Sequence, residues 1–423
     1  MLIAGAIALA GTWTYTARVL IPYQIADSAA HDRPRGNLSD LYPRWLGARE
    51  LLLHGRDPYS AEISQEIQAG YYGRVLDPAH PADPKDQQGF VYPLYVVFYL
   101  APTVHAQFAP VQHVFFWILV ILTVASVPIW LRALRWSPSV CGQLSIVAFT
   151  LGSLGAMQGL KLQQLTLFVV PLIALAVLLL INDHPAIAGV LLALATIKPQ
   201  LVWLLLLCLL IWTAGDWRKR WRWLVSFLVT MAILATASEL VLPHWIPKFL
   251  HAMAEYRKYT GSTSVVEELI PRPWSWLLEL IALAATLYAA WSSRRAAASS
   301  VEFAHTMSAV LAVTVFILPA FAPYNQLLLL PAILLTIRER DLIWRQGLAL
   351  RAILIVMAVL LVWPWLVSAL LAALSYLVAP VLLEKYWALP FWTSLAIPVA
   401  VGALMLFYTL RTRFTSSGEQ GTA

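Results

Sequence analysis

Apolar stretches long enough to cross a lipid bilayer recur through most of this 423-residue chain. A helix needs about 20 mostly apolar residues to cross the hydrocarbon core. Runs that reach or approach this length lie at 2–22, 112–131, 140–157, 164–181, 185–197, 199–213, 222–242, 274–292, 303–321, 325–337, 348–371 and 391–410. We therefore expect an all-α polytopic membrane protein, a single integral membrane domain over residues 1–423, with about twelve transmembrane helices.

The composition supports this class and excludes others. Charged residues make up 12% of the chain and hydrophobic residues 60%, whereas soluble proteins carry about 25% charged residues. Such a chain is neither disordered nor a cytosolic multidomain enzyme. Cys141 and Cys208 lie in separate apolar stretches, so we expect neither a disulfide framework nor a thiolate metal site. The net charge of +7 fits basic cytoplasmic loops, and nothing indicates a nucleic-acid partner.

Short loops rich in arginine and lysine predict which side of the membrane is cytoplasmic. The clusters are Arg132/Arg135, Arg218/Lys219/Arg220/Arg222, Arg294/Arg295, Arg338/Arg340/Arg345 and Arg411/Arg413. All of them fall on one side if segment 90–107, which Pro93 and Pro102 interrupt, does not cross. We therefore expect 90–107 to be an interfacial helix, the first apolar run to stay as an anchor, and both termini to be cytoplasmic at the cell membrane.

The predicted extracytoplasmic loops are the long ones. They comprise 23–89, in which we expect amphipathic helices, then 243–273 and 372–390, whereas the cytoplasmic links are short and basic. No glycine-rich phosphate-binding loop of the Walker or Rossmann kind occurs in the sequence. An enzyme with this layout would act at the outer face and take its activated substrate from the membrane.

One segment of the first loop, 39–59, has the pattern of a short amphipathic helix lying on the membrane surface. Ser39 or Asp40 is expected to cap its N-terminus, Pro43 falls in its first turn, and Gly55 follows its last residue. The helix dipole would favour a charged Asp40 that accepts a proton or positions a hydroxyl. Asp40 could equally do no more than cap the helix.

Further motifs give this pattern a family resemblance. An Asp followed by Tyr42, a short helix and a Gly-x-Asp-Pro-Tyr ending resembles the first outer loop of glycosyltransferase family 87. The resemblance continues at Tyr92-Pro93-Leu94, Leu162-Gln163-Gln164-Leu165, Gly189 to Pro199 and Pro323-Tyr324-Asn325-Gln326. It implies a GT-C fold similar to that of polyprenol-phosphate-mannose-dependent mannosyltransferases, with Asp40 as general base. Some relatives carry histidines where this chain has Asn325 and Gln326.

The chemistry that the resemblance implies needs few groups. One base activates an acceptor hydroxyl as it attacks the anomeric carbon, and cations stabilise the departing phosphate. Direct displacement inverts the anomeric centre, so the paired carboxylates of retaining enzymes are not required. We expect a polyprenyl-phosphate-linked sugar donor, with mannose as the sugar, and a glycolipid or glycan acceptor. No cofactor is expected; no paired acidic motif stands at Asp40, although Glu50 and Asp57 leave a divalent metal open.

Two lysines lie at the outer ends of apolar runs, against the trend for basic residues. Lys198 is followed by Pro199, which ends the helix beside it, and we assign this lysine to the lipid-linked phosphate, with Lys161 second. The alternative is that both lysines extend to the lipid headgroups, as lysines near helix ends commonly do.

Polar residues elsewhere complete the candidate set. The second outer loop offers His251 and Arg257, although its aromatic residues could form an interfacial belt. The remaining substrate-binding candidates are Tyr42, Gln164, Tyr324, Asn325 and Gln326. Those at 324–326 could instead satisfy one another at a turn between helices.

Two other functions stay open from the sequence. A secondary transporter or lipid flippase often has twelve spans with both ends inside, yet no two-fold repeat or matched pair of broken helices is visible. A polymerase or ligase of the O-antigen type also acts on a lipid, and only the quoted motifs distinguish it from a glycosyltransferase of family 87.

Overall fold

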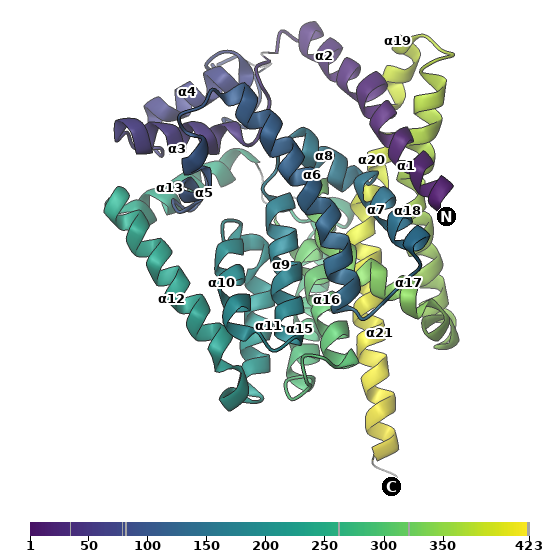
Figure 1. Cartoon of the computed structure of the whole chain (residues 1–423). Helices are drawn as coiled ribbons and strands as arrows, with labels where there is room; N and C mark the ends of the chain where they lie inside the picture. Colours follow the sequence, from purple (N-terminus) through teal and green to yellow (C-terminus); the bar gives the residue numbers. More distant parts are fainter. Residues whose placement is uncertain (34, 78, 81–82, 261–262, 320–321, 421–423) are drawn as a thin grey trace.

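The computed structural model is helical, and no strand occurs among the residues it describes (Figure 1). The description covers 1–423 except residues 34, 78, 81–82, 261–262, 320–321 and 421–423, with 259–260 and 413–420 described by their backbone alone. The helical fold agrees with the all-α prediction.

The chain begins with one long helical rod. Helix α1 (Leu2–Tyr15) continues through a π-helical turn (Thr16–Leu20) into α2 (Ile21–Ala30). The apolar run predicted at 2–22 therefore forms the first part of a longer helix that extends into the first loop. Tyr15, inside the rod, is fully buried.

Two helices of the first loop lie at one end of the molecule. Helix α3 (Tyr42–His54) ends at Gly55, whose φ of +67° is a left-handed conformation that glycine adopts without steric cost. Helix α4 (Ala61–Tyr72) begins at Ser60, whose hydroxyl accepts a hydrogen bond from the amide of Ile63 at 3.3 Å. Gly55 thus ends α3 and Ser60 starts α4, so only a short connection separates the two helices.

Most of the remaining helices form a bundle below this pair in Figure 1, while α19 lies at the upper right of the view. The first half contains α5 (Val96–Leu100), α6 (Phe108–Ala133), α7 (Val140–Leu151), α8 (Leu154–Lys161), α9 (Thr166–Ile181), α10 (Pro185–Ala195), α11 (Trp203–Ala214) and α12 (Trp217–Val241). The second half contains α13 (Trp245–Thr260), α14 (Val265–Leu269), α15 (Trp274–Ser292), α16 (Val301–Ile317), α17 (Leu330–Arg345), α18 (Leu348–Leu374), α19 (Pro380–Leu383), α20 (Leu389–Trp392) and α21 (Ile397–Gln420). Segment 90–107, predicted as interfacial, contains only α5 and a 3₁₀ turn (Ala101–Thr103) as regular helix.

Five helical stretches of the described chain are long and apolar enough to cross a membrane. They are α6, α12, α15, α18 and the stretch Pro380–Thr412, and the bent pair α7–α8 makes a sixth if it is one span. Helices α9, α10, α11 and α16 are apolar but have only 10–17 residues. The chain is therefore a membrane protein with several apolar helices, whereas about twelve spans stays a prediction.

Several of these helices are interrupted toward the end of the bundle that carries α3 and α4 (Figure 1). Helices α7 and α8 meet at an angle of 57°, and short non-helical or 3₁₀ segments join α8 to α9, α10 to α11 and α16 to α17. Backbone polar groups released by such breaks must be satisfied inside the protein or line a wet cavity. Hydrogen bonds at these breaks bring side chains from four parts of the sequence together.

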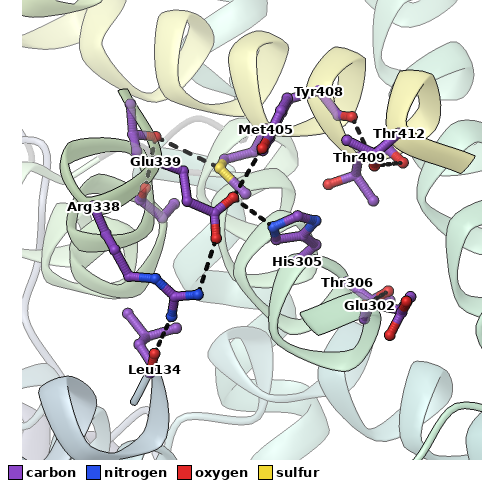
Figure 2. A network of polar contacts seen from close by, with 12 residues as sticks. Leu134, Glu302, His305, Thr306, Arg338, Glu339, Met405, Tyr408, Thr409 and Thr412 are labelled. Carbon is purple, nitrogen blue, oxygen red and sulfur yellow. Dashed lines mark hydrogen bonds and ion pairs between the residues drawn. The ribbon is translucent and has the colours of Figure 1, made fainter. Parts of the chain in front are cut away.

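The opposite end of the bundle is held by a different polar network (Figure 2). Buried Glu339 on α17 accepts hydrogen bonds from His305 on α16 and Tyr408 on α21, at 2.8 and 2.9 Å. Arg338 pairs with Glu339 at 3.2 Å and donates to the carbonyl of Leu134, just past α6. The network therefore ties α16, α17 and α21 together and joins them to the end of α6.

Candidate functional site

The candidate site begins with the carboxylate of Asp40. The hydroxyl of Tyr71 donates to its Oδ1 at 3.0 Å, and the side-chain amide of Gln164 donates to its Oδ2. The Asp40 amide donates to the carbonyl of Leu162 at 2.9 Å, which fixes this residue beside the α8–α9 break. The carboxylate is thus held by two neutral donors.

The expectation that Ser39 or Asp40 caps α3 is wrong. The capping position is Leu41, and no side chain makes a capping hydrogen bond there. The hydroxyl of Ser39 instead accepts from the amide of Leu41 at 3.3 Å, while the Asp40 carboxylate binds residues far away in the sequence. The structural alternative that Asp40 only caps its helix is therefore excluded.

Lys198 lies next to this carboxylate, in the connection between α10 and α11. Its side chain is 4% exposed, and its ammonium donates to Gln164 Oε1 at 2.6 Å and to Thr166 Oγ1 at 2.8 Å. Its Nζ also lies 4.9 Å from the centre of the Tyr324 ring. Since Gln164 in turn donates to Asp40, a single amide separates the ammonium from the carboxylate.

The surroundings of Lys198 disfavour its charge. The pKa of Lys198 is lowered to about 7, mainly by burial and also by the guanidinium of Arg44, while Asp40 acts in the opposite direction. An anion entering the site would favour the charged form, because its negative charge stabilises the ammonium that burial has separated from water.

Arg44 is a second cation of this cluster, half-buried, that the sequence analysis missed. Its guanidinium carbon lies 4.1 Å from the centre of the Tyr92 ring. Burial alone would lower the pKa of Arg44, yet nearby Tyr92 and Asp40 raise it. The sequence offered one signal: Arg44 stands four residues after Asp40, which places the two side chains on one face of the helix predicted over 39–59.

A second carboxylate, Asp86, stands near the same cluster. The hydroxyl of Tyr72 donates to its backbone carbonyl at 2.6 Å, next to the Tyr71 that holds Asp40. Burial raises the pKa of Asp86, and the charge of Asp40 raises it as well. Consecutive tyrosines at the end of α4 therefore bind the side chain of Asp40 and the backbone of Asp86.

Five predicted site residues come together. Asp40, Gln164, Lys198 and Tyr324 are joined as described, and Asn325 Oδ1 accepts from Thr166 Oγ1 at 3.0 Å. The chain of contacts therefore runs from Asn325 through Thr166 to the ammonium and on to the carboxylate.

The other predicted residues lie outside this cluster. Tyr42 packs against Phe108 and Trp45, Gln326 donates to the carbonyl of Ser394 at 2.6 Å, and Lys161 donates to Gln24. His251 and Arg257 are exposed on α13, whereas Tyr256 between them contributes to the electrostatic surroundings of Arg44. Within the described part of the chain, no three His, Cys, Asp or Glu residues gather as a metal site.

The chain matches the family model of glycosyltransferase family 87 over residues 90–319, more than half of its length. Gln164, Thr166 and Lys198 lie inside the matched stretch, and Asp40 and Arg44 precede it. No curated protein and no solved structure matches the chain. The resemblance predicted from the sequence motifs is thus confirmed at the level of the family.

Proposed function

Since the chain belongs to glycosyltransferase family 87, we propose that it transfers a sugar, with mannose as the first candidate, from a polyprenyl-phosphate donor. The acceptor in this proposal is a glycolipid or glycan at the outer face of the membrane. Transfer inverts the anomeric carbon. Asp40 is the general base.

The observation that carries the proposal is a carboxylate and two cations in one cluster. Asp40 is held in place by Tyr71 and Gln164, and the charges of Lys198 and Arg44 lie within electrostatic range of it. A base and cations side by side are what displacement of a phosphate by a hydroxyl requires.

The proposed reaction balances with these groups. The acceptor oxygen forms a bond to the anomeric carbon while its proton passes to the Asp40 carboxylate. The bond between that carbon and the phosphate oxygen breaks, and the electron pair leaves with the phosphate. The positive charges of Arg44 and Lys198 favour this step because negative charge grows on the leaving oxygen. No second carboxylate is needed as nucleophile, which fits inversion.

Neighbouring polar groups supply contacts for sugar hydroxyls. Tyr324 and Asn325 border the cluster and are our first candidates, with Gln164 shared between Asp40 and Lys198. Tyr42, Lys161, Gln326, His251 and Arg257 stay proposals from the sequence, since their described contacts lie outside the cluster.

The placement of the site supports outer-face chemistry. The site lies at the end of the bundle that carries α3, α4 and α13, while the arginine-rich ends of α6, α12, α15 and α17 lie toward the other end (Figure 1). Basic ends favour the cytoplasm, so the Asp40 end would face outward. Nothing described supports the transporter or flippase alternative.

The proposal is tested by the choice of donor. The purified chain in proteoliposomes is given either a radiolabelled polyprenyl-phosphate sugar or the corresponding nucleotide sugar, together with a membrane glycolipid extract as acceptor. We expect labelled product and free polyprenyl phosphate from the lipid donor alone. Transfer from the nucleotide sugar at a comparable rate would contradict the proposal.

A further inference from the structure

Arg44 has hydrogen-bond donors that the protein leaves unused. Its Nε and Nη1 atoms are buried and have no hydrogen-bond partner among the described residues, and no other arginine or lysine there has such atoms. Burying a charged donor without a partner costs free energy, so native proteins usually avoid it. The unused donors therefore point to a ligand with anionic oxygens.

The guanidinium is held without consuming these donors. Its guanidinium carbon lies 4.1 Å from the centre of the Tyr92 ring and the group also hydrogen-bonds the Tyr92 side chain, yet Nε and Nη1 keep no partner among the described residues. Asp40 lies close enough to affect its pKa, but the hydrogen bonds to that carboxylate come from Tyr71 and Gln164. Keeping acid and guanidinium apart leaves one able to accept a proton and the other able to bind an anion.

Lys198 shows the opposite pattern. Two of its three possible donors already bind Gln164 and Thr166, and its ammonium faces the Tyr324 ring. Since Gln164 turns its Oε1 to the ammonium, its Nε2 must point the other way, toward Asp40. Lys198 thereby sets the orientation of the amide that holds the carboxylate.

We infer that the two cations have separate tasks. Arg44 makes the direct contact to a phosphate ester of the bound substrate, and Lys198 is a positioning residue that acts on Asp40 through Gln164. The inference rests on the proposed function, because the phosphate ester at this site is that of the lipid-linked donor. It differs from the expectation drawn from the sequence, which gave the phosphate contact to Lys198.

Direct binding tests Arg44 without requiring catalysis. The full chain in lipid nanodiscs is titrated with a long-chain polyprenyl monophosphate and with the neutral polyprenol of equal length. We expect Arg44→Gln to weaken binding of the phosphate at least about tenfold, with binding of the polyprenol unchanged. Arg49→Gln, on the same helix but stacked on Trp45, is the matched control and should bind as the wild type does.

Two further arms sharpen the result. Inorganic phosphate should compete weakly with the lipid in the wild type and have no effect in Arg44→Gln, which separates recognition of the phosphate from that of the prenyl chain. If Arg44→Gln does not fold, Arg44→Lys keeps the charge but loses the planar fork, and an intermediate affinity supports the inference. If both variants, Arg44→Lys and Arg44→Gln, bind the polyprenyl monophosphate as tightly as the wild type does, the inference is overturned.

Kinetics test the role of Lys198. Lys198→Met should lower kcat at least about tenfold, because the Asp40 carboxylate loses its fixed orientation, while the KM for the donor changes less than about threefold. If Lys198→Met loses more affinity for the polyprenyl monophosphate than Arg44→Gln does, the division of tasks is overturned. If the wild type itself fails to prefer polyprenyl phosphate over polyprenol, the proposed function fails. If the wild type prefers the phosphate but Arg44→Gln binds it equally well, only the role of Arg44 is rejected.

Discussion

At the scale of single residues, the site depends on one amide. Gln164 accepts a hydrogen bond from Lys198 and donates one to Asp40, so an ammonium and a carboxylate are coupled without forming an ion pair. A direct ion pair would stabilise both charges and make Asp40 a weaker base. The inserted amide separates the two charges instead.

The lowered pKa of Lys198 predicts a pH dependence. The ammonium form exists below its pKa of about 7, so activity that depends on this form falls as pH rises through that value. We expect an alkaline limb near pH 7 in kcat/KM, which reports the free enzyme. The limb should move to higher pH in kcat, because the bound phosphate stabilises the ammonium.

Two variants control this pH profile. Lys198→Met should lack the limb near pH 7 in kcat/KM, whereas Lys219→Met, exposed at the far end of the molecule, should retain it. A limb that persists unchanged in Lys198→Met would assign the titration to another group.

The sequence could give some of these residues and not others. Asp40, Gln164, Lys198, Tyr324 and Asn325 stand in recognisable motifs or at unusual places for a charge, so they were predicted. Tyr71, Thr166 and Asp86 join the cluster through tertiary contacts alone, and Tyr92, although it stands in a quoted motif, was not predicted as a site residue. No periodicity or spacing indicates which of 16 tyrosines will face a carboxylate.

At the scale of helices, the two ends of the bundle use polar residues differently. Near Asp40, polar side chains satisfy broken helices and leave Arg44 donors unused. At the far end, Glu339 pairs with His305, Tyr408 and Arg338, and these contacts hold intact helices together (Figure 2). The first arrangement suits binding, and the second suits stability.

This difference gives a prediction for Glu339. Glu339→Ala leaves buried His305 and Tyr408 without their acceptor, which should destabilise the protein by about 3–5 kcal/mol. The change should appear as a lower Tm in detergent, while the donor KM of the folded fraction stays unchanged. Arg340→Ala, exposed on the same helix, is the control; a Tm loss of the same size there would contradict the special role of Glu339.

The observed helix boundaries show that an apolar run in the sequence need not form one continuous helix. The run at 140–157 is bent by 57° between α7 and α8, and the run predicted at 325–337 starts as a 3₁₀ turn, Pro323–Leu329. A sequence run reveals apolarity, but proline and tertiary contacts decide whether the helix continues through it. The interruptions between α8 and α9, α10 and α11, and α16 and α17 hold three of the candidate site residues, Gln164, Lys198 and Tyr324.

At the scale of the whole molecule, the account requires a polarity across the membrane. Helical composition and the family were predicted from sequence, because lipid as solvent leaves few alternatives to apolar helices. The number of spans was harder to predict, since α9, α10, α11 and α16 are shorter than the roughly 20 residues of a full crossing. Long outer loops and basic inner links place the Asp40 end outside in our proposal.

The most direct measurement compares sugar transfer by the wild type and Asp40→Asn, at equal amounts in the membrane and with a saturating polyprenyl-phosphate sugar. The substitution keeps the size of the side chain and one of its two accepting oxygens but removes its basicity. The account predicts a fall in kcat of at least about a hundredfold, while Asp32→Asn, exposed in the same loop, keeps wild-type activity. Transfer by Asp40→Asn at the wild-type rate would contradict the account.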